Sequence, residues 1–208
     1  PEPSMRPDEV LIEVKYIGLC GSDLNTYRGT SPMVTYPRVP GHEIAGIIVD
    51  EGTDVPDHLS LGDRVTLKPY TECGHCPACR AGRTNCCQFN ETLGVQREGA
   101  LTARISVPYR QVYASETLSL QELALVEPMS VGYHAANRAA ITETDTVLII
   151  GCGTIGLGAI SAAARKGARV LVSDIDDGKL EIARRFGALH TINSLKEDVL
   201  AAIASLTN

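Results

Sequence analysis

The chain has 208 residues, of which 44% are hydrophobic and 21% charged, so it holds enough apolar side chains for one domain or two small ones. Its formal net charge of −6 argues against a nucleic-acid partner, because such a partner requires a basic surface. No apolar run is long enough to cross a bilayer, and the first residues lack the basic, then apolar, pattern of a secretory signal, so we expect no membrane partner.

The first half of the chain is predicted to be rich in β-strands. Residues 10–16 alternate between two faces, as a half-buried strand does, and run into an expected turn at Gly18 to Gly21. Short apolar runs bounded by turn residues predict further strands at 44–49, 65–67, 101–107 and 112–113.

The second half changes to a helical period. Ser119 and Glu122 form a capping box that opens a helix, and Pro128 interrupts this helix before helical spacing resumes at 129–139. A second capping box, of Ser194 and Glu197, is expected to open a last helix.

Between these two capping boxes, strands and helices alternate. Strands are predicted at 146–150, 169–173 and 190–192, and helices follow the first two of them and end at Lys166 and Phe186. Alternation of this kind is the signature of a doubly wound α/β unit with a parallel sheet.

A glycine-rich turn lies between the first of these strands and its helix. It reads G-x-G-x-x-G, and its residues are Gly151, Cys152, Gly153, Thr154, Ile155 and Gly156. This context is typical of a dinucleotide-binding turn, in which the backbone approaches the pyrophosphate and the helix N-terminus attracts its charge. Asp174, at the end of the next strand, would accept hydrogen bonds from the adenosine ribose and repel a 2′-phosphate, which favours NAD over NADP.

Seven cysteines are present, and five of them lie between residues 73 and 87. An odd number of cysteines is not typical of a secreted disulfide framework, so these thiols indicate a reducing, cytoplasmic compartment and a bound metal. The spacing of Cys73, Cys76, Cys79 and Cys87 suits a closed tetrahedral zinc site. Two alternatives remain open here: Cys86 could replace Cys87, and an iron–sulfur cluster also takes four cysteines.

Other candidate metal ligands are scattered along the chain. Cys20 lies in Gly18-Leu-Cys-Gly-Ser-Asp23, His42 and Glu43 follow Pro40-Gly41, and Glu127 precedes Pro128. Periodicity alone cannot bring these residues together, and each of them alone is more often structural than functional.

With these residues, the chain resembles the zinc-dependent medium-chain dehydrogenases, in particular the polyol (sorbitol), threonine and sugar-acid branch. The motifs GLCGSD, VPGHEIAG, LGDRV, CGHCPACRAGRTNCC, LVEPMSVGYHA and VLIIGCGTIGLGA occur in family order across essentially the whole chain. The resemblance implies a β-rich GroES-like catalytic domain over 1–128 and the first half of a Rossmann NAD-binding domain over 129–208. Both domains would be incomplete, so we expect the chain to be part of a longer dehydrogenase.

The resemblance also implies roles for individual residues. Ser22 would accept the substrate proton, Asp23 would orient a zinc-bound histidine, and Lys179 would contact the adenosine ribose. Cys20, His42 and Glu127 would hold a catalytic zinc, Glu43 would ligate in alternation with a water or hold that water, and Cys73, Cys76, Cys79 and Cys87 would hold a structural zinc. Many relatives carry a histidine five residues after the zinc cysteine, whereas this chain has Asn25, which cannot titrate.

The substrate class follows from the same resemblance. We expect hydride transfer to NAD from a secondary alcohol of a polyol or a sugar acid, such as a sorbitol-like or galactonate-like molecule. The alternatives are an L-threonine 3-dehydrogenase, a simple alcohol dehydrogenase, or a zinc- and dinucleotide-binding sensor that is not an enzyme. Relatives of this type imply a homodimer or a homotetramer for the full-length protein.

Overall fold

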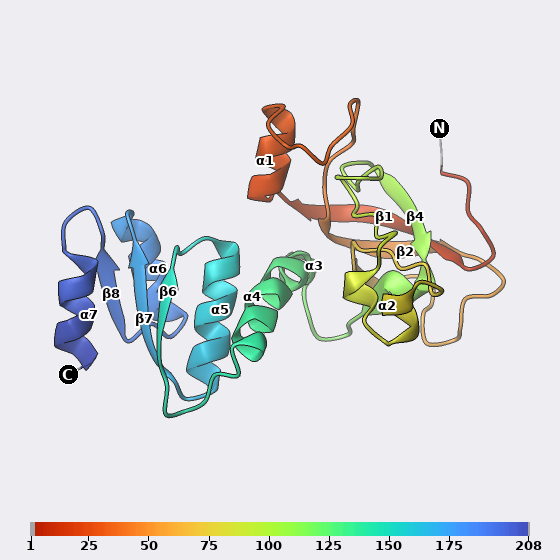
Figure 1. Cartoon of the computed structure of the whole chain (residues 1–208). Coiled ribbons are helices and arrows are strands. Elements are labelled where there is room, and N and C mark those ends of the chain that lie inside the picture. Colours follow the sequence, from red (N-terminus) through yellow and green to blue (C-terminus); the bar gives the residue numbers. More distant parts are fainter. Residues whose placement is uncertain (1–2, 208) are drawn as a thin grey trace. The chain divides into compact units, whose positions relative to one another are not determined.

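The computed structural model describes residues 3–207, and these form two compact units that meet in sequence at Glu127 and Pro128. Figure 1 shows the elements of both units. Among the described residues, no helix is both long and apolar enough to cross a membrane.

The first unit is built on a five-stranded antiparallel sheet with the order β4-β1-β2-β3-β5. Its strands are β1 (Glu9–Gly18), β2 (Glu43–Glu51), β3 (Arg64–Leu67), β4 (Arg104–Pro108) and β5 (Val112–Ala114). Its helices are α1 (Gly21–Tyr27), α2 (Pro77–Arg80) and α3 (Leu120–Ala124), with 3₁₀ turns at Thr84–Cys86 and Tyr109–Gln111. The five predicted strands are therefore confirmed, although β4 begins at Arg104 rather than at residue 101.

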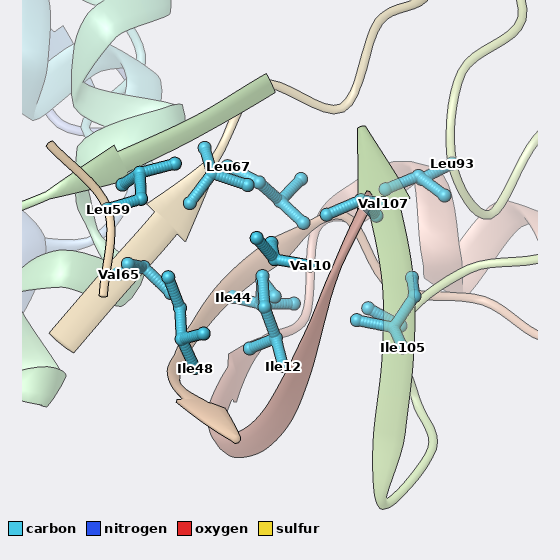
Figure 2. Packing of buried hydrophobic residues seen from close by; sticks show 12 residues of the cluster. Val10, Ile12, Ile44, Ile48, Leu59, Val65, Leu67, Leu93, Ile105 and Val107 are labelled. Atoms are coloured by element: carbon cyan, nitrogen blue, oxygen red, sulfur yellow. The ribbon is translucent and has the colours of Figure 1, made fainter. Parts of the chain in front are cut away.

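The core of this unit is made of β-branched and leucine side chains from the sheet (Figure 2). Ile12 on β1 and Ile44 on β2 are fully buried, and Val65 on β3 packs in the same cluster. Branched side chains suit the pleated surface of a strand, which explains why these short runs form a sheet. The sheet in turn fixes the ends of β1 and β2, where the candidate metal ligands lie.

The turn predicted at Gly18 to Gly21 is only partly correct, because α1 begins at Gly21. The N–H of Cys20 donates to Oδ2 of Asp23 at 2.8 Å, which caps this helix with a carboxylate in its first turn. The helix has no apolar stripe, so hydrophobic periodicity gives no signal for it.

The helix predicted around Pro128 divides earlier than expected. Ser119 and Glu122 form the predicted capping box of α3, which ends at Ala124 with Leu125 as its C-cap. The next helix, α4 (Val126–Arg138), contains Pro128 in its first turn, where a missing N–H costs nothing.

The second unit contains a parallel sheet with the order β6-β7-β8, as the alternating pattern predicts. Its strands are β6 (Thr146–Ile150), β7 (Arg169–Asp174) and β8 (His190–Asn193). Its helices are α5 (Thr154–Arg165), α6 (Asp177–Arg185) and α7 (Val199–Thr207). Ile160 of α5 and Leu180 of α6 pack against Val170 and Val172 of β7 in the core.

The capping box predicted at Ser194 and Glu197 is wrong. Oδ1 of Asp198 accepts hydrogen bonds from the N–H groups of Leu200 and Ala201, at 2.9 and 3.1 Å, so Asp198 caps α7. Glu197 instead accepts from the N–H of Asn193, which belongs to the preceding strand. The motif places the cap at Ser194, whereas α7 begins after Asp198.

We expect Ile12→Ala to lower the free energy of unfolding by about 2–5 kcal/mol, because it leaves a cavity in a fully buried part of the sheet core. Leu61→Ala is the matched control, since Leu61 is 60% exposed in the same unit, and we expect it to change stability by less than about 0.5 kcal/mol. Urea unfolding followed by circular dichroism measures both variants. Equal losses would contradict the assignment of the core.

Candidate metal centres and dinucleotide turn

The four predicted cysteines of the loop at 73–87 converge on one point. The Sγ atoms of Cys73, Cys76, Cys79 and Cys87 all lie within 4.8 Å of one another. Two of the Sγ–Sγ distances, Cys73 to Cys79 and Cys76 to Cys87, are 4.0 Å. A tetrahedral zinc with Zn–S bonds of about 2.3 Å needs sulfurs about 3.8 Å apart, so the loop fits this ion. An iron–sulfur cluster would hold its cysteines further apart, because irons and sulfides lie between them.

Backbone N–H groups point at these sulfurs. Cys73 donates to Cys87, Cys76 to Cys73, Cys79 to Cys76 and Phe89 to Cys87, at 3.3–3.5 Å. Hydrogen bonds of this kind favour the thiolate, and the N–H of Cys79 accordingly lowers the pKa of the Cys76 thiol. Burial and the neighbouring thiols raise the pKa of Cys79 to about 12, so the loop without an ion does not favour the thiolate at every position. Its four converging sulfurs are nevertheless the ligand set of a closed zinc site.

The structure also shows which of Cys86 and Cys87 belongs to the group of four sulfurs. Cys87 is buried and belongs to the group of four, whereas Cys86 is exposed and its sulfur accepts from the side-chain amide of Asn85 at 3.5 Å. The 3₁₀ turn at Thr84–Cys86 contains Cys86, and Cys87 is its C-cap.

A second group of ligand atoms forms where β1 ends and β2 begins. The antiparallel pairing places Gly18 opposite Glu43, so Cys20, which follows β1, comes close to His42, which precedes β2. The ligand atoms of Cys20, His42 and Glu43 lie within 4.8 Å of one another. Residues that are more than 20 positions apart are thus brought together by sheet register alone.

Asp23 lies behind this group. Its Oδ1 accepts from the N–H of Gly41 at 3.2 Å and lies 3.6 Å from Nδ1 of His42. Burial alone would raise the pKa of Asp23, but His42 and the N–H of Cys20 lower it overall. The pKa of His42 is raised to about 9, chiefly by Asp23 and against the effect of burial. A carboxylate in this position orients a ligating histidine.

Glu127 is buried beside the same group, and its Oε1 accepts a hydrogen bond from the hydroxyl of Tyr70 at 3.1 Å. Burial raises the pKa of both Glu43 and Glu127, while the charge of His42 opposes this in each case. Glu43 lies tightly against Gly18, where an added Cβ would come within 2.2 Å of its Oε2. One thiol, one imidazole and two buried carboxylates form a donor set that suits Zn²⁺.

Two predicted residues near this group lie at the surface. Ser22 is exposed in the first turn of α1, two residues after Cys20, and Asn25 is exposed further along the same helix. Tyr70 is a residue that the sequence did not reveal. It is a single tyrosine in a loop, and no spacing connects it to Glu127.

The glycine-rich turn has the geometry that the motif predicts. Gly151 has a φ of +96°, in the left-handed region, and an added Cβ on Gly156 would lie 2.0 Å from the carbonyl oxygen of Gly151. Gly153 is the N-cap of α5, and a Cβ built on it meets no atom within 4 Å. The backbone before α5 is therefore open to a phosphate, next to the positive end of the helix dipole.

Asp174 ties this turn to the end of β7. Its Oδ2 accepts from the N–H of Cys152 at 2.6 Å, and its Oδ1 accepts from the N–H groups of Ile175 and Asp176. The hydrogen bond from Cys152 is the main reason why the pKa of Asp174 is lowered, and the charge of Lys179 contributes. The carboxylate is thus held ionised beside the turn, with Lys179 near it.

Comparison with known proteins supports the resemblance. Residues 6–117 match the family model described as "Alcohol dehydrogenase GroES-like domain", and residues 154–208 match "Zinc-binding dehydrogenase". The sorbitol dehydrogenase of Bacillus subtilis is 41% identical over 216 residues, covering 100% of this chain and 60% of that protein. The L-galactonate-5-dehydrogenase of Escherichia coli is 41% identical over 174 residues, covering 84% of this chain and 51% of that protein.

Two solved structures of dehydrogenases are also similar to the chain. A putative zinc-binding dehydrogenase from Sinorhizobium meliloti, bound to NADP, has a TM-score of 0.88 and 35% identity, covering 96% of this chain and 58% of its own. An alcohol dehydrogenase (rspB) from E. coli complexed with NADH has a TM-score of 0.91 and 33% identity, covering 100% of this chain and 61% of its own.

The chain belongs to the zinc-binding alcohol dehydrogenase family, as the motifs indicate, and relatives named sorbitol dehydrogenase and L-galactonate-5-dehydrogenase support the polyol and sugar-acid branch. Its fold class is confirmed as well: a GroES-like unit is followed by part of a Rossmann unit. The chain spans 51–61% of the length of the relatives described above.

We expect Cys87→Ser to lose one zinc per chain, whereas Cys86→Ser keeps it, because only Cys87 belongs to the group of four sulfurs. Elemental analysis after dialysis measures both variants. The loss of Cys87 should also lower stability, since a structural zinc contributes folding free energy directly. Loss of zinc from the Cys86 variant instead would contradict the assignment.

Proposed function

We propose that the full-length protein is a zinc-dependent oxidoreductase that transfers a hydride from a secondary alcohol of a polyol or sugar acid to NAD. The observation that carries this proposal is the convergence of Cys20, His42 and Glu43, with Glu127 beside them, in a unit whose cysteine loop holds a separate closed site. Residues 1–128 would form the catalytic unit and residues 129–208 the NAD-binding unit. The free thiols favour a cytoplasmic location.

Bound zinc would act as a Lewis acid that lowers the pKa of an alcohol, so that the alcohol gives up its proton near neutral pH. The chain's own residues would bind the ion, orient its ligands and accept the substrate proton. Cys20, His42 and Glu127 would hold the ion, and Asp23, whose Oδ1 lies 3.6 Å from Nδ1 of His42, would orient the ring of His42. Glu43, pressed against Gly18, would hold a water or ligate in turn. Ser22 is exposed at the start of α1, where it can accept the substrate proton.

The second unit supplies the support for NAD. The open backbone at Gly151 and Gly153, with Thr154 and Ile155 in the first turn of α5, would bind the pyrophosphate, and Gly156 lets the helix pack closely against Gly151. The ionised Asp174 would accept from the ribose hydroxyls, with Lys179 beside it, and would repel a 2′-phosphate. This charge is the reason for preferring NAD, although one solved relative binds NADP.

The test is a panel of substrates with the full-length protein, carried out with NAD and with NADP. We expect reduced nicotinamide to form with polyols or aldonates and NAD, and we expect two zinc ions per chain. Cys20→Ser should lower turnover by at least about 1,000-fold while NAD binding persists, because the loss of the Lewis acid removes several kcal/mol of stabilisation. Turnover only with L-threonine, or only with primary alcohols, would contradict the substrate class. Dinucleotide binding without any turnover would favour the sensor.

We expect Asp174→Asn to lower kcat/KM with NAD by about 10- to 100-fold, because a charged hydrogen-bond acceptor is replaced by a neutral one. The ratio of kcat/KM with NAD to kcat/KM with NADP should therefore fall. Asparagine keeps an oxygen for the N–H of Cys152, so the turn should remain folded. Glu181→Gln is the control, since Glu181 forms an exposed ion pair with Arg184 on α6. An unchanged cofactor preference in the Asp174 variant would show that this carboxylate does not select NAD.

A further inference from the structure

The hydroxyl of Tyr70 reaches a buried carboxylate that lies far away in the sequence. Tyr70 is 40% exposed, whereas Glu127 is 8% exposed, and their side chains meet at 3.1 Å. We propose that Tyr70 is a positioning residue, which holds the carboxylate of Glu127 in one orientation at the metal site and thereby sets how tightly this ligand binds the metal. The inference rests on the proposed function, in which Glu127 is a zinc ligand.

Glu127 needs such a partner because its backbone is fixed whereas its carboxylate can rotate. The backbone lies in the first turn of α4, directly before Pro128, and is therefore fixed. The terminal torsion of a glutamate is broad, so the carboxylate can rotate about its last bond. Burial and the charge of Glu127 raise the pKa of Tyr70 to about 12, so the phenol is protonated and donates one hydrogen bond. That bond engages Oε1 and restricts the rotation of the carboxylate, and ligating carboxylates are usually held in this way.

Tyr70 itself is held by its backbone. Its carbonyl oxygen accepts from the side-chain amide of Gln111 at 2.7 Å, and Gln111 is buried. An isolated β-bridge joins Tyr70 to Thr92, and the N–H of Leu93 donates to the carbonyl oxygen of Pro69 at 3.0 Å. These contacts fix the backbone of Tyr70, so the phenol extends from a fixed point and can hold Glu127 in place.

This placement also connects the two metal sites of the first unit. Tyr70 precedes Cys73 by three residues, and Thr92 and Leu93 follow Cys87, so the bridge closes the base of the cysteine loop. The residue that closes this loop is the same one that donates to Glu127. The structural site therefore supports the catalytic one through a single side chain.

The experiment compares Tyr70→Phe with wild type as zinc-loaded, full-length protein, and with protein in which Co²⁺ replaces zinc at the Cys20 site. We expect the affinity of that site for zinc to fall by about 10- to 100-fold, as when other partners of ligating groups are removed. The visible absorption bands of the cobalt form should shift, and kcat/KM should fall while the KM for NAD stays unchanged. Tyr113→Phe is the control, because Tyr113 is 55% exposed on β5, and we expect no change.

A double-mutant cycle separates positioning from packing. In a Glu127→Ala background, Tyr70→Phe should have no further effect on zinc affinity, because its partner is already absent. Additive losses, or a Tyr70→Phe protein with the wild-type cobalt spectrum and zinc affinity, would overturn the role of Tyr70 and leave the proposed function standing. A wild-type protein that binds no metal at Cys20 and His42 would overturn both.

Discussion

The carboxylate of Asp23 is the contact on which the candidate catalytic site depends. Oδ2 accepts from the N–H of Cys20, and Oδ1 accepts from the N–H of Gly41 and lies beside His42. One buried side chain thus joins the segment after β1 to the segment before β2. It also begins α1, which would otherwise have a free N-terminus. The helix cap and the orientation of the histidine are therefore two consequences of the same group.

Charge explains why this cluster is suited to a cation. Glu43 and Glu127 are buried, and burial raises the pKa of each carboxyl because no water stabilises the ionised form. His42 is the cationic group that opposes this effect for both of them. A divalent ion among these donors would favour the deprotonated carboxylates far more strongly than one imidazolium does, and metal binding would release protons.

The parts that sequence predicts well are those in which the signal is local. The cysteine spacing, the glycine turn and the alternation after residue 146 each lie within a short segment, and the structure shows all of them. The assembly of Cys20 with His42 needs the pairing of β1 with β2, which no local pattern specifies, so only the resemblance suggested it. The hydrogen bond from Tyr70 to Glu127 spans 57 positions and gives no sequence signal at all. Even locally, the spacing of Ser194 and Glu197 matches a capping box, but Asp198 caps α7, because geometry that spacing cannot show decides which side chain reaches the first N–H groups.

The two metal sites differ in what holds them in place. The Cys20 site lies where the inner strands β1 and β2 meet at their ends, in a sheet whose core contains Val10, Ile12 and Ile44, so its ligands are positioned by apolar packing before any ion binds. The cysteine loop consists of short helical turns with hydrogen bonds to sulfur, and Cys76 and Cys87 are its buried side chains between residues 73 and 87. A metal there replaces the missing core, in the way that small metal-bound domains are stabilised. The loop would therefore depend on its ion for structure, whereas the sheet would depend on its ion only for chemistry.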